Sequence, residues 1–228
     1  MPVFLLSDEI IFPEPRLSEA DGLLAMGGDL GIDRLVLAYR MGIFPWYGPK
    51  QPILWWSPDP RLVLYPESFH ISRSLIKTLK SGRFTVTFDR QFREVITACA
   101  HTPRHHQPGT WITDDMRDAY CRLHEAGYAH SVEVREQDQL VGGLYGVSLG
   151  RCFFGESMFS QKSNASKVGL AALVDRLRSR SFHLIDCQVT TDHLVRLGAQ
   201  EIPRKQFLSE LETALNSPTR IGNWSKMA

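Results

Sequence analysis

Residues 152–167, CFFGESMFSQKSNASK, constrain the fold more than any other stretch of the chain. They begin as an apolar run that predicts a buried strand, break at Gly155 and place Glu156 directly at the strand end. From Ser166 onwards the apolar spacing becomes helical. A strand that presents an acid and then leads through small polar residues into a helix is a common way to form a pocket floor.

The flanking segments complete an α+β pattern. Strands are predicted at residues 62–65, 84–88, 131–135, 140–149, 183–189 and 199–202, and helices at residues 32–41, 72–80, 90–100, 113–126, 166–181, 192–197 and 204–215. Residues 1–30, rich in Pro, Gly and acids, indicate an irregular segment. This order predicts a central mixed sheet flanked by helices. It is also the order of the N-acetyltransferase (GNAT-like) fold, a likeness that by itself says little about function.

Three tryptophans, Trp46, Trp55 and Trp56, stand among several prolines. Proline fixes φ and excludes helix, so these aromatic side chains are expected on stiff, extended backbone. They could form the core of a small subdomain, or one of them could stack on a base or an adenosine. The sequence leaves both roles open.

Composition excludes some partners. The formal net charge of +1 excludes a polycation, so any nucleic-acid contact has to come from a local patch. Bases outnumber acids between residues 61 and 110, which indicates either a solvated basic face or a patch that follows phosphates. At 228 residues and 43% apolar content, the chain can bury the core of one large domain, or of a small and a larger one.

The remaining signals predict a cytosolic protein without a metal. The cysteines are widely spaced and form no CxxC motif, which predicts reduced thiols. No signal peptide is recognisable, and no apolar run approaches the roughly 20 residues of a membrane span. His101, His105 and His106 share a Pro-rich loop, but adjacent histidines rarely chelate one ion and no acid or cysteine joins them. We therefore predict no metal site.

Two apolar strands carry acids. Asp186 and Gln188 are two residues apart on one predicted strand, so their side chains are expected on the same face. A buried carboxylate requires a hydrogen bond or a partner, and an internal salt bridge would satisfy it. The alternative is functional: Glu156 also ends an apolar strand, and if the two strands are neighbours the acids converge on one cavity. Two acids and an amide without a nucleophile suit a reaction whose substrate arrives already activated.

Ten short motifs are spread along the chain. They are GGDL (27–30), GIFPW (42–46), ILWWSPDPR (53–61), HISRS (70–74), GTWIT (109–113), LVGGLYGV (140–147), GESMFS (155–160), NASK (164–167), LIDCQV (184–189) and GAQEIPR (198–204). Taken together, they resemble the bacterial leucyl/phenylalanyl-tRNA–protein transferases, and the match is collinear from about residue 20 to residue 208.

The resemblance implies a cytosolic, monomeric enzyme of the N-end rule pathway. It would move Leu or Phe, and Met less well, from aminoacyl-tRNA to the N-terminal amine of proteins that begin with Arg or Lys, without a cofactor and without a membrane. The implied architecture is a small N-terminal α/β domain, residues 1–62, and a GNAT-like catalytic domain, residues 63–228.

The same resemblance assigns roles to residues. Asp186 would hold the carboxamide of Gln188, Gln188 would contact the attacking amine, and Glu156 would lie near that amine and help to bind the cationic acceptor. Trp46 and Trp111 would flank the 3′-terminal adenosine. The side chain of Leu or Phe would enter a pocket formed by Leu144, Leu170, Leu173, Leu177 and Ile185. Leu170, Leu173 and Leu177 share one helix face, as plain core residues also would.

Such a transfer requires little catalytic assistance from the protein. The aminoacyl ester is already activated, and an α-amine with a pKa of about 7.7–8.0 needs little help to lose its proton near neutral pH. A carboxamide is too weak a base, so we expect Gln188 to orient the amine. For the tRNA, the best candidates for phosphate contacts are Arg61, Arg73, Lys77, Lys80 and Arg83.

Two other classes compete with this interpretation. A GNAT-like acetyltransferase should carry a Q/RxxGxG/A loop at the start of the helix that follows the meander, and SQKSNASK has no such glycines. A non-catalytic tRNA- or peptide-binding module would not need Glu156, Asp186 and Gln188 in buried strands.

Overall fold

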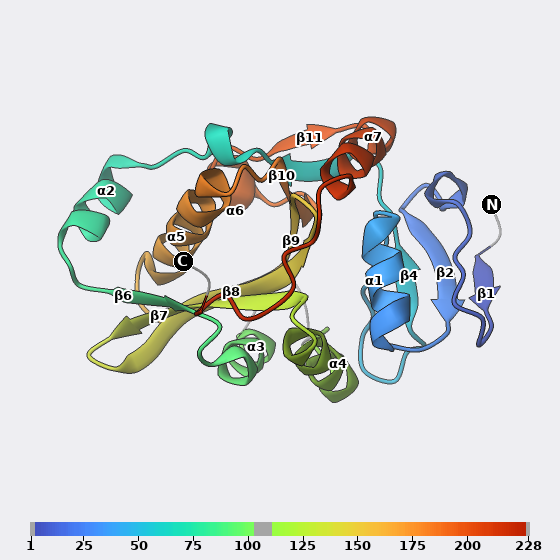
Figure 1. Cartoon of the computed structure of the whole chain (residues 1–228), viewed down its shortest axis with the longest axis horizontal. Helices are drawn as coiled ribbons and strands as arrows, with labels where there is room; N and C mark the ends of the chain where they lie inside the picture. The colour runs from blue at the N-terminus through green and yellow to red at the C-terminus, as the bar shows by residue number, and fades with distance from the viewer. Residues whose placement is uncertain (1–2, 103–110, 227–228) are drawn as a thin grey trace.

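The first part of the chain forms a small four-stranded sheet (Figure 1). The structure is a computed structural model that describes residues 3–102 and 111–226. The strand order of this sheet is β1-β2-β4-β3, with β1 and β2 parallel. The expectation of an irregular segment over residues 1–30 is wrong here, because strands this short carry too little periodicity to be predicted. The strands are β1 (Phe4–Leu6), β2 (Leu23–Gly27), β3 (Phe44–Pro45) and β4 (Leu54–Trp56).

A seven-stranded mixed sheet forms the centre of the molecule, with the order β11-β5-β10-β9-β8-β7-β6. Its neighbours are antiparallel except β9 and β10, which run parallel. The α+β class with a central mixed sheet is confirmed. The strands are β5 (Arg61–Leu64), β6 (Thr85–Phe88), β7 (Ala129–Glu136), β8 (Gln139–Leu149), β9 (Cys152–Ser160), β10 (Leu184–Gln188) and β11 (Gln200–Ile202).

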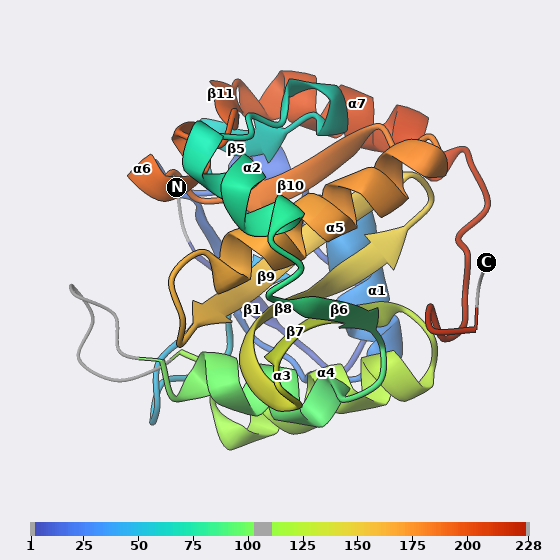
Figure 2. The same ribbon diagram turned by 90° about the vertical axis from the view of Figure 1, so that its left-hand side faces the viewer.

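Helices cover both faces of the central sheet. Helix α5 lies on one face with α2 against it, and α3 and α4 lie on the other (Figure 2). Helices α1 and α7 lie between the two sheets (Figure 1). The α-helices are α1 (Ile32–Arg40), α2 (Arg73–Lys80), α3 (Phe92–Ala100), α4 (Asp114–Glu125), α5 (Ala165–Ser179), α6 (Asp192–Val195) and α7 (Arg204–Leu215), and the short 3-10 helices are η1 (Pro15–Leu17) and η2 (Pro66–Ser68).

Local chemistry explains the element ends. The hydroxyls of Ser72 and Thr113 accept hydrogen bonds from backbone N–H groups and cap α2 and α4, as expected for N-cap residues. A bulge in β8 lies beside Gly142, where the pairing with β7 skips one residue. A Cβ at Gly142 would lie 2.6 Å from the Cβ of Ala165, so this glycine lets α5 approach the sheet closely.

Two cores result. One lies between the sheet and α3, α4, α1 and α7, and the other lies under α5. After α7, the chain runs back across the molecule (red in Figure 1) and buries Trp224 in the second core. Within residues 3–102 and 111–226, no helix combines the length and apolar content needed to cross a membrane. The division of the chain at residue 62 stays a prediction.

Candidate active site

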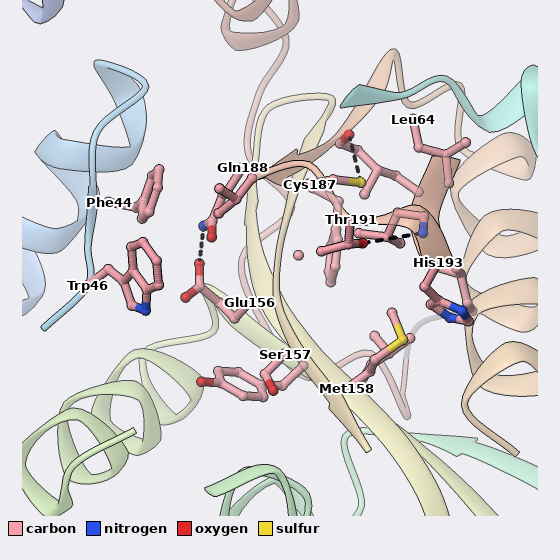
Figure 3. A pocket seen from close by; sticks show the side chains of 18 of the residues that line it. Phe44, Trp46, Leu64, Glu156, Ser157, Met158, Cys187, Gln188, Thr191 and His193 are labelled. Atoms are coloured by element: carbon pink, nitrogen blue, oxygen red, sulfur yellow. Dashed lines mark hydrogen bonds between the residues drawn. The ribbon is translucent and has the colours of Figure 1, made fainter. Parts of the chain in front are cut away.

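A pocket opens where β9 and β10 separate. The two strands pair only from Cys152 opposite Leu184 to Phe154 opposite Asp186. Beyond that point β9 continues along β8, while β10 shifts its register on β5 and turns at Gln188, whose φ is +63°. The separation leaves a cavity of about 510 Å³ between the two sheets and α5 (Figure 3).

Glu156 lies at the point of separation and is buried, with 9% of its surface exposed. Its carboxylate accepts three hydrogen bonds: from the hydroxyl of Tyr39 at 2.7 Å, from the hydroxyl of Tyr120 at 3.0 Å, and from Nε2 of Gln188 at 2.9 Å. Burial raises the pKa of Glu156 to about 7, although the three donors act to lower it. The two tyrosine hydroxyls also contact each other. Glu156 can therefore exchange a proton near neutral pH.

Gln188 is held in place by both acids, but not as the resemblance implied. Its carboxamide Nε2 donates to Glu156, whereas its backbone N–H donates to Oδ1 of Asp186 at 2.9 Å. Asp186 thus fixes the backbone turn at Gln188 and leaves the carboxamide to Glu156. The alternation expected for one strand face fails, because the register shift lies between the two residues. The carboxamide oxygen of Gln188 is left to accept a hydrogen bond from a ligand.

The expectation that Arg61 contacts tRNA phosphates is wrong. Arg61 is fully buried and forms two hydrogen bonds with Asp186, Nε to Oδ1 at 2.8 Å and Nη2 to Oδ2 at 2.7 Å. Its guanidinium lies between the rings of Phe44 and Phe207, at 4.8 and 4.5 Å from their centroids. Arg61 therefore cannot contact tRNA, and Asp186 is neutralised by it.

The aromatic end of the cavity includes Trp46 and Trp111. Trp46 projects from the segment after β3 beside Phe44 (Figure 3), and its backbone carbonyl accepts the indole N–H of Trp56 at 2.6 Å. Of the three tryptophans in the Pro-rich segment, Trp55 is completely buried in the core, and Trp46 is the one that faces the cavity. Trp55 thus has the core role that the sequence left open, and stacking of Trp46 on a base or an adenosine stays a prediction.

The apolar end of the cavity lies under α5. Leu144, Leu170, Leu173 and Ile185 all line it, each almost fully buried. Leu177 does not: it lies one helical turn further along α5 and packs in the core, away from the cavity. Sequence reasoning missed several residues that complete the wall, namely Leu64, Phe153, Met158, Cys187, Thr191, His193 and Leu194.

The remaining basic candidates lie outside the cavity. Arg73, Lys77 and Lys80 are exposed on α2, which is fixed to the start of α5 by a hydrogen bond from Nδ2 of Asn164 to Oγ1 of Thr78 at 3.1 Å (Figure 2). Arg83 is engaged with Glu136, with 2.5 Å between Nε and Oε1, and covers the ring of Phe84. Helix α2 thus presents these three exposed cations next to the helix that forms one wall of the cavity.

The described part of the chain contains no group of three or more His, Cys, Asp or Glu side chains that could hold a metal. Of the predicted loop histidines, His105 and His106 lie outside the described residues, as do Gly109 and Thr110 of the GTWIT motif.

Comparisons with known proteins agree over nearly the whole chain. Two family models match, "Leucyl/phenylalanyl-tRNA protein transferase" over residues 63–212 and its "N-terminal domain" over residues 28–59. A protein from Syntrophobacter fumaroxidans is 60% identical over 98% of this chain and 96% of its own length. Another, from Desulfatibacillum aliphaticivorans, is 57% identical over 99% and 97%. Both are named leucyl/phenylalanyl-tRNA–protein transferase.

Solved structures are more distant. One, titled as L-PGS from Bacillus licheniformis, is 12% identical, with a TM-score of 0.39 over 74% of this chain and 53% of its own. Another, a GCN5-related N-acetyltransferase from Kribbella flavida, is 10% identical, with a TM-score of 0.36 over 73% and 59%.

Proposed function

This chain belongs to the leucyl/phenylalanyl-tRNA–protein transferase family and is therefore an aminoacyltransferase, and we propose that it transfers Leu or Phe in the pocket between β9 and β10. One observation carries the placement. A single cavity joins an aromatic end, an apolar end, and between them the paired side chains of Glu156 and Gln188. These three regions match the adenosine, the amino-acid side chain and the reacting amine.

The donor is held at both ends of the cavity. Trp46 and Trp111 receive the 3′-terminal adenosine, because indole rings offer stacking surfaces to a base. The side chain of Leu or Phe is received by Leu144, Leu170, Leu173 and Ile185, since these buried residues form an apolar wall of the cavity. This placement brings the ester carbonyl between the two ends, beside Glu156.

The acceptor amine is oriented by Gln188. Because Nε2 of Gln188 donates to Glu156, the carboxamide oxygen is the group available to accept a hydrogen bond from the incoming amine. Asp186 acts one step further away: it holds the backbone turn that places this carboxamide. Asp186 is thus a positioning residue, fixed in turn by Arg61.

Glu156 takes the proton. With a pKa of about 7, its carboxylate accepts a proton from an α-ammonium group, whose pKa is about 7.7–8.0, at little free-energy cost. The neutral amine then attacks the ester carbonyl carbon, a C–N bond forms, and the C–O bond to the ribose breaks. The nitrogen, now bonded to the carbonyl carbon, loses a second proton, and the departing ribose oxygen takes that proton up, so the transfer is balanced without a cofactor.

The proposed acceptors are proteins that begin with Arg or Lys. Glu156 is the one acidic side chain among the described residues that line the cavity, and a cation brought beside it favours its ionised, proton-accepting form. The tRNA is proposed to contact Arg73, Lys77 and Lys80 on α2, with Arg83 beside them, through its phosphates.

We propose a monomeric enzyme that works in the cytoplasm, where charged tRNA is available, with residues 1–62 as a small domain and residues 63–228 as the catalytic domain. The two sheets support this division, because the small sheet lies within residues 4–56 and the larger within residues 61–202.

A direct transfer assay tests the function. The protein is mixed with labelled leucyl- or phenylalanyl-tRNA and a peptide that begins with Arg, beside matched peptides that begin with Lys or Ala. We expect extension of the Arg and Lys peptides only. The absence of any extended peptide while the tRNA stays charged would overturn the proposal, and equal extension of the Ala peptide would overturn the acceptor preference.

A further inference from the structure

The chain ends in an extended arm, residues 216–226, that adds no group to the cavity and lies beyond the residues matched by the family model. Its Trp224 is nevertheless among the most deeply buried large side chains, with 2% of its surface exposed. An arm that only closed the molecule would not need to place an indole inside the second core.

Trp224 is fixed from three directions. Its backbone N–H donates to Oδ2 of Asp89 at 2.6 Å, and its carbonyl accepts a hydrogen bond from Nη1 of Arg176 on α5 at 2.9 Å. Its indole stacks on the imidazole of His130, with 3.9 Å between ring centroids and 14° between planes. His130 is itself held by Asp89 at 2.8 Å. The indole therefore has one defined position.

That position places Trp224 directly behind the apolar end of the cavity. The centroid of its ring system lies 5.9 Å from the ring of Phe153, which lines the cavity and is almost fully buried. Another neighbour confines Phe153 as well, because a Cβ added at Gly146 would lie 2.6 Å from its ring. Phe153 thus packs against both Gly146 and Trp224, in the same apolar cluster as Leu173 and Ile185.

From this geometry, and on the basis of the proposed function of the pocket, we propose that the arm sets the choice between Leu and Phe, with Trp224 as a positioning residue that acts through Phe153. While Trp224 is in place, the Phe153 ring stays at the wall, where a Leu side chain reaches it. Without the indole, the ring has space to withdraw. A Leu side chain is then too short to touch the wall, whereas a Phe side chain fills the space.

The test measures binding of two non-transferable probes, adenosine carrying Leu or Phe through a 3′-amide bond. For Trp224→Ala, we expect the affinity for the Leu probe to fall about tenfold and that for the Phe probe less than about threefold. Trp224→Phe retains a ring, so its ratio of Leu-probe to Phe-probe affinity should lie between those of the wild type and Trp224→Ala. The exposed arm residue Ile221 supplies the control, since Ile221→Ala should change neither affinity. In transfer assays, kcat at saturating donor should stay within about twofold, because no reacting group is touched.

A merely structural role gives a different result. It would lower the folded fraction, measured by circular dichroism, and lower the affinities for both probes by the same factor. An unchanged ratio of the two affinities in folded Trp224→Ala, or in Trp224→Phe if the alanine variant does not fold, would overturn the inference. Failure of the proposed function is distinct, because wild-type protein would then bind neither probe.

Discussion

The carboxamide of Gln188 donates to the carboxylate of Glu156 across 2.9 Å, and this hydrogen bond joins two strands at the point where they separate. Each side chain determines what the other can do. The donated N–H leaves the amide oxygen of Gln188 for a ligand, and the carboxylate of Glu156 retains a proton affinity suited to an amine.

Replacing Gln188 tests this relationship. Gln188→Ala removes the orienting group, whereas Gln188→Glu places a second carboxyl beside Glu156, and the two then share one proton. In its protonated form the new carboxyl still donates to Glu156, so Gln188→Glu should keep more activity than Gln188→Ala at pH 6. The advantage should shrink as the pH rises far enough to remove the shared proton, because the two carboxylates then repel each other. Equal loss in both variants at pH 6, measured as kcat, contradicts the orienting role.

Tyr39→Phe should shift the pH dependence of kcat to higher pH. Tyr39 donates to Glu156, and this hydrogen bond favours the ionised form, so its removal raises the pKa of Glu156 above about 7. Because the carboxylate must be ionised to accept a proton, the rise of kcat with pH should shift to higher pH. Tyr65→Phe is a suitable control, since the Tyr65 hydroxyl binds Glu210 instead. A shift to lower pH, or none, would refute Glu156 as the proton acceptor.

The buried pair of Arg61 and Asp186 gives a prediction on stability. Arg61→Ala leaves the carboxylate of Asp186 uncompensated in the core, which should lower the free energy of unfolding by about 3–5 kcal/mol. Urea unfolding measures this change.

Asp186→Ala distinguishes an effect on the position of Gln188 from an effect on the binding of aminoacyl-tRNA. It frees the backbone turn at Gln188, so kcat should fall by a larger factor than the affinity for aminoacyl-tRNA. A variant that lost affinity alone would show that the turn does not serve the chemistry.

Two leucines on one face of α5 form a matched pair. Leu173 lines the cavity and Leu177 does not, although both are almost fully buried. Each substitution to Ala should destabilise the protein by about 2–5 kcal/mol. Leu173→Ala alone should raise the KM for leucyl-tRNA, measured well below the unfolding temperature. An equal rise in the Leu177 variant would show that the cavity extends further than its wall residues indicate.

The cations on α2 predict a dependence on salt. Lys77→Ala should raise the KM for tRNA and reduce the slope of log KM against log salt concentration by roughly 1, because one phosphate contact is lost. Arg93→Ala is the control: Arg93 is exposed on α3, on the opposite face, and is paired with Asp118. The contact is refuted if both variants behave alike.

Much of this fold could be predicted, because its elements have strong local signals. The alternating sequence of residues 131–135 in β7, the Ser72 and Thr113 caps and the acid after CFFG are all local. The sequence placed both Glu156 and Gln188 near strand ends, which holds for Gln188 at the end of β10. For Glu156 the expected strand end is wrong, because β9 continues to Ser160, and the two side chains meet where β10 separates from β9.

The features that could not be predicted depend on contacts between residues that are far apart in the sequence. Arg61 was expected at the surface because a base at the start of a strand is usually solvated, and only the carboxylate of Asp186 explains its burial. The partner of the Gln188 carboxamide was misassigned, since a register shift is invisible in an alternating pattern. Tyr39 and Tyr120 were missed because a tyrosine at an apolar helical position is indistinguishable from core.

The ion pair between Arg61 and Asp186 also determines when the site comes into existence. The two residues are 125 positions apart, so at synthesis rates of 5–20 residues per second Arg61 precedes its partner by roughly 6 to 25 s. Until Asp186 emerges, Arg61 lacks its partner, and β10 is not there to separate from β9. A growing chain on the ribosome, surrounded by charged tRNA, therefore lacks the proposed transfer site until residue 188 has been synthesised.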